Sequence, residues 1–198
     1  MQDLCVRLTG ITPLLIHCDQ AANPFNKYSK ALKHLTSRRK KTDQDYMEMA
    51  RLEWESGLYL YDGSVQLPAD NFEACFLAGA KMSKVGKQYK AGASLVDDHI
   101  PLTYKGPSIS VQSSGEIPNP ELDKYFDLYK HQQMVKVGAQ KVLRTRPVFQ
   151  EWKCEIALMY NEAMIDERTL FAAIENAGKY VGMCEKRPRL GRFEVEKI

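Results

Sequence analysis

The chain has 198 residues, of which 44% are hydrophobic, 27% are charged and 10% are aromatic, and its formal net charge is +3. This composition is that of a globular protein with enough apolar residues for a core. No window approaches the roughly 18 consecutive apolar residues of a transmembrane helix, so we expect no membrane span. The first residues also lack the basic start and the long apolar run of a secretory signal.

The first third of the chain is predicted to form one strand, two helices and a hairpin. Residues 3–9 alternate between apolar and polar side chains, which favours a strand that ends at Gly10. The first helix is expected over 25–36, with Asn23 as its cap. The second helix is capped by Thr42 or Asp43 and ends at Gly57. The dipeptide Asp62-Gly63 then predicts a tight hairpin of 58–61 and 64–67.

The rest of the chain continues with alternating helices and strands. A helix is expected over 70–82, a basic loop over 84–92, a strand over 100–104 and an irregular excursion over 105–123. Strands are expected at 142–149 and 152–160, then a helix that begins after Asp166 and ends at Gly182, and a last strand at 192–196.

This order of elements predicts an α+β protein. We expect a ferredoxin-like or RRM-like antiparallel sheet with helices on one face, in which the first strand, the 58–67 hairpin and the 70–82 helix form one half. Residues 1–198 would form a single domain with helical and loop insertions at about 20–57 and 84–140.

The distribution of charge is more informative than its sum. Residues 21–42, 74–96 and 128–150 contain no Asp or Glu, and a fourth basic cluster follows at 186–192. Separation of one charge sign into several segments is typical of a polyanion-binding surface, although solvated loops whose charges balance in space would give the same pattern. The predicted nucleic-acid contacts are Lys27, Lys30, Lys33, Arg38, Arg39, Lys40, Lys41, Lys84, Lys87, Tyr89, Lys90, Arg144, Arg146, Lys186, Arg187, Arg189 and Arg192.

Four aromatic residues lie beside these basic segments in the sequence. Tyr28, Tyr89, Phe149 and Phe193 could stack on unpaired bases, and the alternative for each is a place in the core.

The sequence offers no set of catalytic or metal-binding residues. The four histidines are far apart, and the five cysteines are scattered without a C-x-x-C pair, so we predict no metal and no other cofactor. The odd cysteine count also argues against a disulfide framework and for a reducing cytoplasm. Asp97-Asp98-His99 is best explained as a polar turn. Cleavage of RNA without metal needs only one base near a 2′-hydroxyl, and His34 in the basic segment is best placed for it.

Three local strings resemble the RAMP superfamily, the RRM-like proteins of CRISPR effector complexes, and in particular their backbone subunits. The strings cover 65–74, where a strand runs through Pro68 into a helix, the strand 142–149, and the loop 182–193 that contains Gly182 and Gly191. The chain is most similar to compact, virus-encoded relatives. The resemblance implies a nucleic-acid-binding protein whose subunits line up along one strand, in the host cytoplasm if the protein is viral.

Three functional hypotheses follow. The first is a non-catalytic protein that binds single-stranded DNA or RNA and forms a head-to-tail homo-oligomer, with a groove lined by Lys27–Lys41, Lys84–Lys90, Arg144, Arg146 and Arg187–Arg192. The second is a metal-independent endoribonuclease of the RAMP type. The third is a viral protein-interaction module that acts on a host complex.

Overall fold

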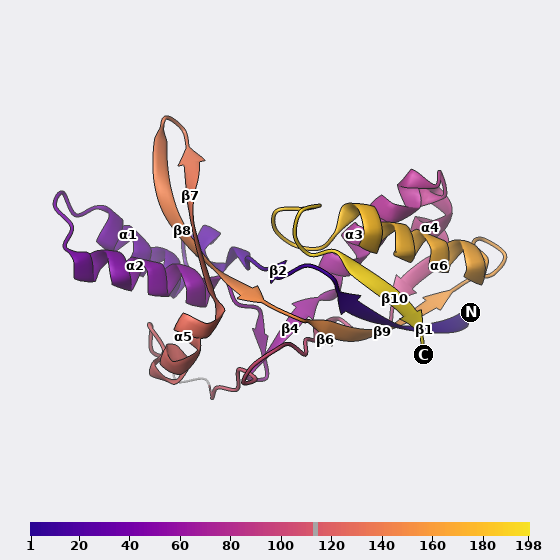
Figure 1. Cartoon of the computed structure of the whole chain (residues 1–198), viewed down its shortest axis with the longest axis horizontal. Coiled ribbons are helices and arrows are strands. Elements are labelled where there is room, and N and C mark those ends of the chain that lie inside the picture. Colours follow the sequence, from indigo (N-terminus) through magenta and orange to yellow (C-terminus); the bar gives the residue numbers. More distant parts are fainter. Residues whose placement is uncertain (113–114) are drawn as a thin grey trace. The chain divides into compact units, whose positions relative to one another are not determined.

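The computed structural model describes residues 1–112 and 115–198 and confirms an α+β fold with antiparallel sheets (Figure 1). The chain divides into two compact units. Unit 1 comprises Met1–Leu14, Gln66–Lys105 and Phe149–Ile198, and unit 2 comprises Leu15–Val65 and Gly106–Val148. Unit 2 is therefore built from two segments that overlap the expected insertions, but the second begins at Gly106 rather than at residue 84.

Unit 1 contains a four-stranded sheet and the helices that cover it. Its elements are β1 (Gln2–Gly10), α3 (Ala69–Met82), α4 (Gly86–Gly92), β5 (Ala93–Leu95), β6 (His99–Pro101), β9 (Lys153–Tyr160), α6 (Glu167–Asn176), the π-helical turn η3 (Ala177–Val181) and β10 (Phe193–Lys197).

The sheet of unit 1 has the strand order β10-β1-β9-β5, and all neighbours are antiparallel. With α3 after β1 and α6 after β9, this is the ferredoxin-like order. The prediction that the 58–67 hairpin belongs to this sheet was wrong. The edge strand next to β9 is β5, and the hairpin of β3 (Leu60–Tyr61) and β4 (Ser64–Pro68) lies outside this sheet. The three residues of β5 are too short a run for their periodicity to identify them as a strand.

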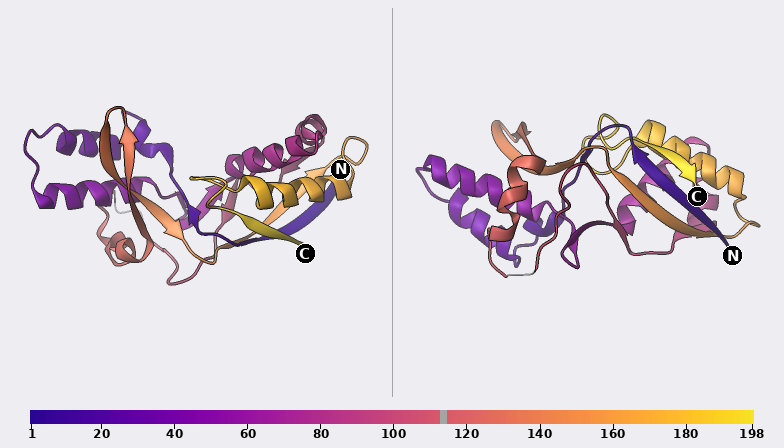
Figure 2. Two further views of the ribbon diagram at one scale, coloured as in Figure 1. Left: turned by 45° about the horizontal axis from the view of Figure 1, so that its top comes forward. Right: turned by 60° about the horizontal axis from the view of Figure 1, so that its bottom comes forward.

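The helices α3 and α6 lie on the same side of the β1, β9 and β10 strands (Figures 1 and 2). The alternation in β9 explains this layer, because Cys154, Ile156, Leu158 and Tyr160 are all buried, as the sequence predicted. Phe76 of α3 meets Phe193 of β10 at a centroid distance of 6.4 Å. The apolar core of unit 1 therefore lies between the sheet and the helices.

The packing of α3 against α6 requires a residue without a side chain. A Cβ atom at Gly79 would lie 2.3 Å from the carbonyl oxygen of Ala173 and 2.6 Å from the amide nitrogen of Ala177. The two helix backbones approach each other closely at this point, and no flexible side chain can yield to make room.

Unit 2 consists of a helix pair, two hairpins and a long connection. Its elements are η1 (Asp19–Ala22), α1 (Lys27–Thr36), α2 (Asp43–Ser56), β3, η2 (Pro120–Leu122), α5 (Asp123–Tyr129) and β7 (Lys130–Val137). The strands β2 (Leu14–Leu15), β4 and β8 (Gln140–Phe149) begin in one unit and end in the other.

The helix pair follows its sequence signals closely. Thr42 and Asp45 form a capping box at the start of α2, and Gly57 follows its last turn, as expected. The start of α1 differs from the prediction, because Asn26 rather than Asn23 caps it, by accepting a hydrogen bond from the Tyr28 amide. Tyr28 and Leu35 of α1 pack with Leu52 of α2 in a small core.

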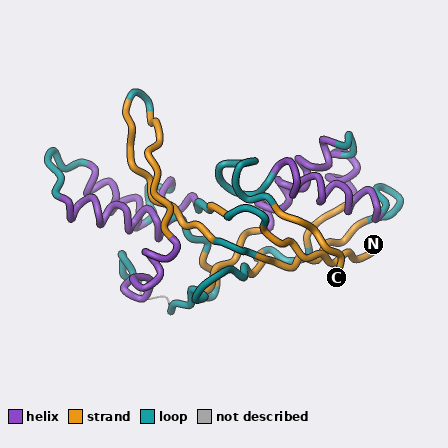
Figure 3. Tube along the Cα trace, viewed as in Figure 1, coloured by secondary structure: helices purple, strands orange, loops and turns teal. Residues whose placement is uncertain are grey.

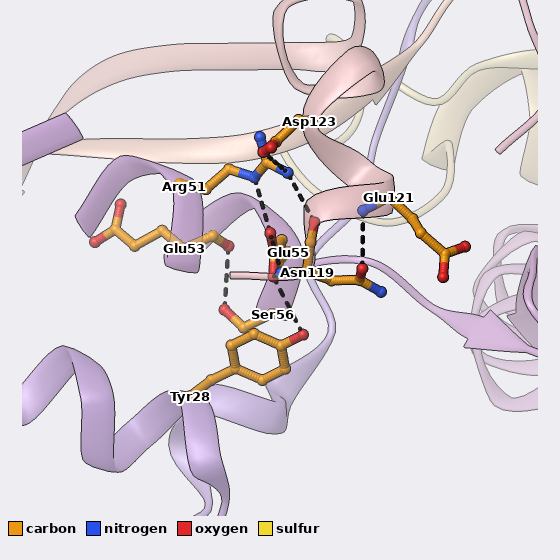
Figure 4. A network of polar contacts seen from close by, with 8 residues as sticks. All are labelled: Tyr28, Arg51, Glu53, Glu55, Ser56, Asn119, Glu121 and Asp123. Atoms are coloured by element: carbon orange, nitrogen blue, oxygen red, sulfur yellow. Dashed lines mark hydrogen bonds and ion pairs between the residues drawn. The ribbon is translucent and has the colours of Figure 1, made fainter. Parts of the chain in front are cut away.

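A buried carboxylate fixes the connection 115–122 on α2 (Figure 4). Both oxygens of Glu55 lie 3.0 Å from the Asn119 amide that donates to them, and Arg51 Nε donates to Oε1 at 2.8 Å. Tyr28 donates its hydroxyl hydrogen to Oε2 at 3.5 Å, and Arg51 also pairs with Asp123 at 2.6 Å. Burial raises the pKa of Glu55, while the donors from Asn119 and Arg51 oppose that change.

Replacement of Gly79 by alanine tests the helix contact in unit 1. Alanine normally stabilises a helix interior by about 1 kcal/mol relative to glycine. Here we expect Gly79→Ala to lower the free energy of unfolding by about 1–3 kcal/mol, because the added methyl group meets the backbone of α6 and η3. Urea denaturation measures this change, with the exposed Ala74→Ser on the same helix as the control. A gain of stability in Gly79→Ala would contradict the packing.

Candidate nucleic-acid interface

The strands β7 and β8 form a long two-stranded ribbon in unit 2 (Figure 3). The sequence predicted β8 but not β7, whose side chains are mostly exposed and show no apolar alternation. Gly138 lies in the turn with φ +60°. In this register His131 faces Arg146, Gln133 faces Arg144 and Val135 faces Val142. Directly opposed residues share one face of the ribbon, so these pairs lie together.

Residues of both hairpin strands line a cavity of about 570 Å³, here called the hairpin cavity, and Arg144, Arg146 and Val135 of this face are among them. Its positively charged residues are Lys136, Arg144 and Arg146, and its only carboxylate among the described residues is Glu53. His17 and Leu32, which lie outside the hairpin, also line it. The sequence did not identify Lys136 or His17 as site residues, although Lys136 lies in an acid-free window.

Arg144 is not an independent contact for a ligand. Its guanidinium pairs with Glu53 of α2, and the second oxygen of Glu53 accepts a hydrogen bond from the Thr145 amide at 2.9 Å. The prediction that Arg144 serves a bound nucleic acid is therefore corrected: its charge already neutralises a mostly buried carboxylate and fastens the hairpin to α2.

The basic run near the helix pair is only partly available. Lys27, Lys30 and Lys33 are exposed on α1, and Arg39 and Lys40 are exposed in the loop that follows. Arg38 instead pairs with Asp45, and Lys41 Nζ donates to the Arg38 carbonyl at 2.9 Å. The hydrogen bonds from Thr42 lower the pKa of Asp45, and Arg38 adds to this effect. Arg38 thus contributes to the start of α2.

In unit 1, the end of α3 and part of α4 line an open cavity of about 650 Å³. We call it the lysine cavity, because four lysines and no carboxylate line it among the described residues. These lysines are Lys81, Lys84, Lys87 and Lys90. Lys81 was missed by sequence reasoning, although it stands in the same acid-free window as the other three.

Residues 86–92 form a helix, and the expected basic loop was wrong there. Tyr89 explains the difference, because its ring is 3% exposed and anchors α4 against the core while Lys87 and Lys90 stay in solvent. Tyr89 therefore cannot stack on a base. A single apolar anchor among lysines gives too weak a periodic signal to predict a two-turn helix.

The other aromatic candidates are also buried. Tyr28, Phe149 and Phe193 are 8%, 0% and 2% exposed, so the core alternative holds for each. The open face of the unit 1 sheet offers no substitute: β1, β9 and β10 lie within the described residues, and none of their outward side chains is aromatic. Arg7 on this face pairs with Glu155 and Glu196. Base stacking of the RRM type is thus unsupported.

The loop 182–192 carries the last basic cluster. Gly182 and Gly191 have φ values of +76° and +73°, and the Met183 amide donates to the Gly191 carbonyl at 2.8 Å. Arg187 and Arg189 are exposed, Lys186 is half-buried, and the buried Nε of Arg192 has no hydrogen-bond partner among the described residues. The Cys75 thiol donates to the Gly182 carbonyl at 3.1 Å, and burial raises the pKa of Cys75 to about 12.

Comparison with known proteins does not assign a family. No protein-family model matches the chain, and a search of curated proteins finds no match either. Within residues 1–112 and 115–198, no helix has the length and hydropathy that crossing a bilayer requires. Nor do three His, Cys, Asp or Glu side chains meet in a metal-binding group anywhere in these ranges. The fold and the two basic cavities therefore carry the functional argument.

The two roles assigned within the hairpin cavity can be separated by charge reversal. Arg144→Glu places a second carboxylate beside Glu53, so we expect it to lower the free energy of unfolding by about 1–3 kcal/mol. Lys136→Glu changes an exposed side chain and should alter stability by less than about 0.5 kcal/mol. Thermal and urea unfolding measure both. Equal stability of the two variants would show that Arg144 does not fasten the hairpin.

Proposed function

We propose that this protein binds single-stranded nucleic acid without cleaving it and assembles head-to-tail along the strand. The observation that carries the proposal is the pair of basic cavities, one in each unit: four lysines and no carboxylate line the lysine cavity, and Lys136, Arg144 and Arg146 line the hairpin cavity with Glu53 as the one carboxylate among the described residues. Phosphate groups are the ligands that such surfaces attract most strongly. Lys84, Lys87 and Lys90 in unit 1 and Lys136 and Arg146 in unit 2 are the principal contacts.

Phosphate contacts rather than base stacking are the expected binding mode, because the described residues that line these two cavities include no aromatic side chain. Contacts from lysine and arginine to phosphate are common to every sequence, so little sequence preference is expected. A flexible single strand can bend its phosphates into a concave surface, whereas a duplex is stiff over about 150 base pairs. Single strands should therefore bind more tightly than duplexes.

The head-to-tail arrangement is supported by the resemblance to the RAMP backbone subunits. Contacts between two different surfaces of identical chains propagate as a ring or a filament, and a long strand then joins many copies. No cofactor is required for this activity.

Salt dependence tests the phosphate contacts. The affinity for a fluorescent 30-nucleotide strand should fall steeply between about 50 and 300 mM NaCl, because binding releases counterions. Replacing Lys84, Lys87 and Lys90 together by glutamine should reduce the slope by about one for each lost phosphate contact. Lys179→Gln, an exposed lysine of unit 1 outside the cavity, is the control. A flat salt dependence of the wild type would refute the proposal.

A second candidate is a metal-independent ribonuclease, favoured by the position of His17 in the hairpin cavity beside Lys136 and Arg146. An imidazole there could take the proton of a 2′-hydroxyl while the cations stabilise the phosphate. His34, the candidate from the sequence, lies instead in the last turn of α1.

The two candidates differ in their products. If the protein only binds, labelled RNA should remain intact in EDTA, and His17→Ala should change nothing. Cleavage by the wild type that disappears in His17→Ala but persists in His34→Ala would replace the binding proposal with the ribonuclease. Denaturing gels of the RNA after incubation give the answer.

A further inference from the structure

A second large cavity of unit 2 has a different chemical character. It has a volume of about 720 Å³ and lies between α2, α5 and the β7–β8 hairpin. Tyr46, Met47 and Leu143 line it and are 57%, 72% and 46% exposed. Large apolar side chains gathered around a concave surface indicate a contact site for an apolar group. We call this the acceptor cavity.

The inner wall of the acceptor cavity is an aromatic ring held between cations. Phe126 contacts Trp54 edge to face at a centroid distance of 5.5 Å. The Arg51 guanidinium lies 5.2 Å from the Phe126 centroid, and Lys130 Nζ lies 4.9 Å from it. An incoming aromatic side chain would therefore meet a preformed aromatic and aliphatic surface, which needs no rearrangement.

The rim of the acceptor cavity carries more negative than positive charge. Its carboxylates are Glu48, Asp123 and Asp127, and its cations are Arg51 and Lys130. Arg51 pairs with Asp123, and Lys130 pairs with Asp127. Glu48 forms no ion pair with any of the described residues. A partner with an apolar group beside positive charges would be complementary to this rim.

The same unit presents such a group on a different surface. Phe25 is 83% exposed, the highest value among the large apolar residues of the chain that the structure describes. Its position is set by two local turns, because Asn23 Oδ1 accepts from the Phe25 amide at 3.0 Å and Asn26 caps the helix that follows. Lys27 and Lys30 come next and are exposed, and Lys27 Nζ donates to the Gly115 carbonyl at 3.1 Å.

Phe25 and the acceptor cavity cannot be one surface. Helix α1, which begins two residues after Phe25, packs on the face of α2 that carries Leu52 and Met49. The cavity lies on the face of α2 that carries Met47 and Arg51. A contact between them in two copies is therefore heterologous and can repeat.

We propose that Phe25 of one copy inserts into the acceptor cavity of the next copy, with Lys27 and Lys30 beside the acidic rim. This inference rests on the head-to-tail assembly of the proposed function and names its contact. A rigidly presented aromatic anchor in a concave apolar site is the kind of residue that dominates binding energy at interfaces. Within such an oligomer, only the terminal copy whose Phe25 has no neighbour would expose this side chain to water.

Self-association of the protein without nucleic acid tests the contact. Sedimentation velocity between about 1 and 200 µM should show oligomers of the wild type, and Phe25→Ala and Met47→Glu should each weaken the association on the order of 10- to 100-fold. Both positions are exposed, so the folded units should persist, as unchanged circular dichroism would verify. Tyr180→Ala, an aromatic of unit 1 that is 50% exposed, is the matched control and should associate like the wild type.

Mixing the two variants provides the decisive measurement. Phe25→Ala retains the cavity and Met47→Glu retains Phe25, so an equimolar mixture should form 1:1 dimers at concentrations where each variant alone is monomeric. Association of Phe25→Ala at the wild-type level, or a mixture that stays monomeric, would overturn the inference. If single strands bind cooperatively in Phe25→Ala as in the wild type, the contact is wrong and the proposed function stands. If the protein binds no nucleic acid but the mixture still forms dimers, the Phe25 contact stands and the proposed function is wrong.

Discussion

The carboxylate of Glu55 joins three parts of unit 2 that are far apart in the sequence. It accepts hydrogen bonds from the Asn119 amide, from Arg51 and from Tyr28, and it is fully buried in doing so. An isolated charge in that position would be strongly unfavourable, and removal of one partner of a buried pair typically costs about 3–5 kcal/mol. The start of the 119–129 segment is thus fixed on α2, and with it the wall of the acceptor cavity.

Glu53, two residues earlier on the same helix, has the corresponding role for the hairpin. Residues two apart on a helix point to nearly opposite sides, so Glu55 faces the 119 connection and Glu53 faces Arg144 and Thr145. Helix α2 therefore fixes the 119 connection and the β7–β8 hairpin through two carboxylates, Glu55 and Glu53. Apolar packing adds to this, through the small cluster of Tyr28, Leu35 and Leu52 and through the buried Trp54, which contacts Phe126.

Much of unit 1 could be predicted from local patterns, since alternation in β9 and the cap at Asp166 each reflect forces within a few residues. The elements that were missed depend on distant partners. The strand β7 is held by β8 rather than by an apolar face, and α4 is held by one buried tyrosine. The candidate site shows the same limit: one acid-free window contains the four lysines that line the lysine cavity, and their role as nucleic-acid contacts stays a prediction. Only the fold could reveal that Arg144 meets a carboxylate 91 positions away in the chain.

The β7–β8 ribbon separates the hairpin cavity from the acceptor cavity by the thickness of one pleated layer. Arg146 and Val135 face the first, and Gln132 and Leu143 line the second. Because side chains alternate along a strand, substitution of Arg146 or Val135 can alter the hairpin cavity and leave the acceptor cavity unchanged, although Lys136 and Thr145 of the other face also line the hairpin cavity. A one-residue deletion would instead exchange the two sets at once. The ribbon can thus tolerate point substitutions in evolution far more easily than changes in its length.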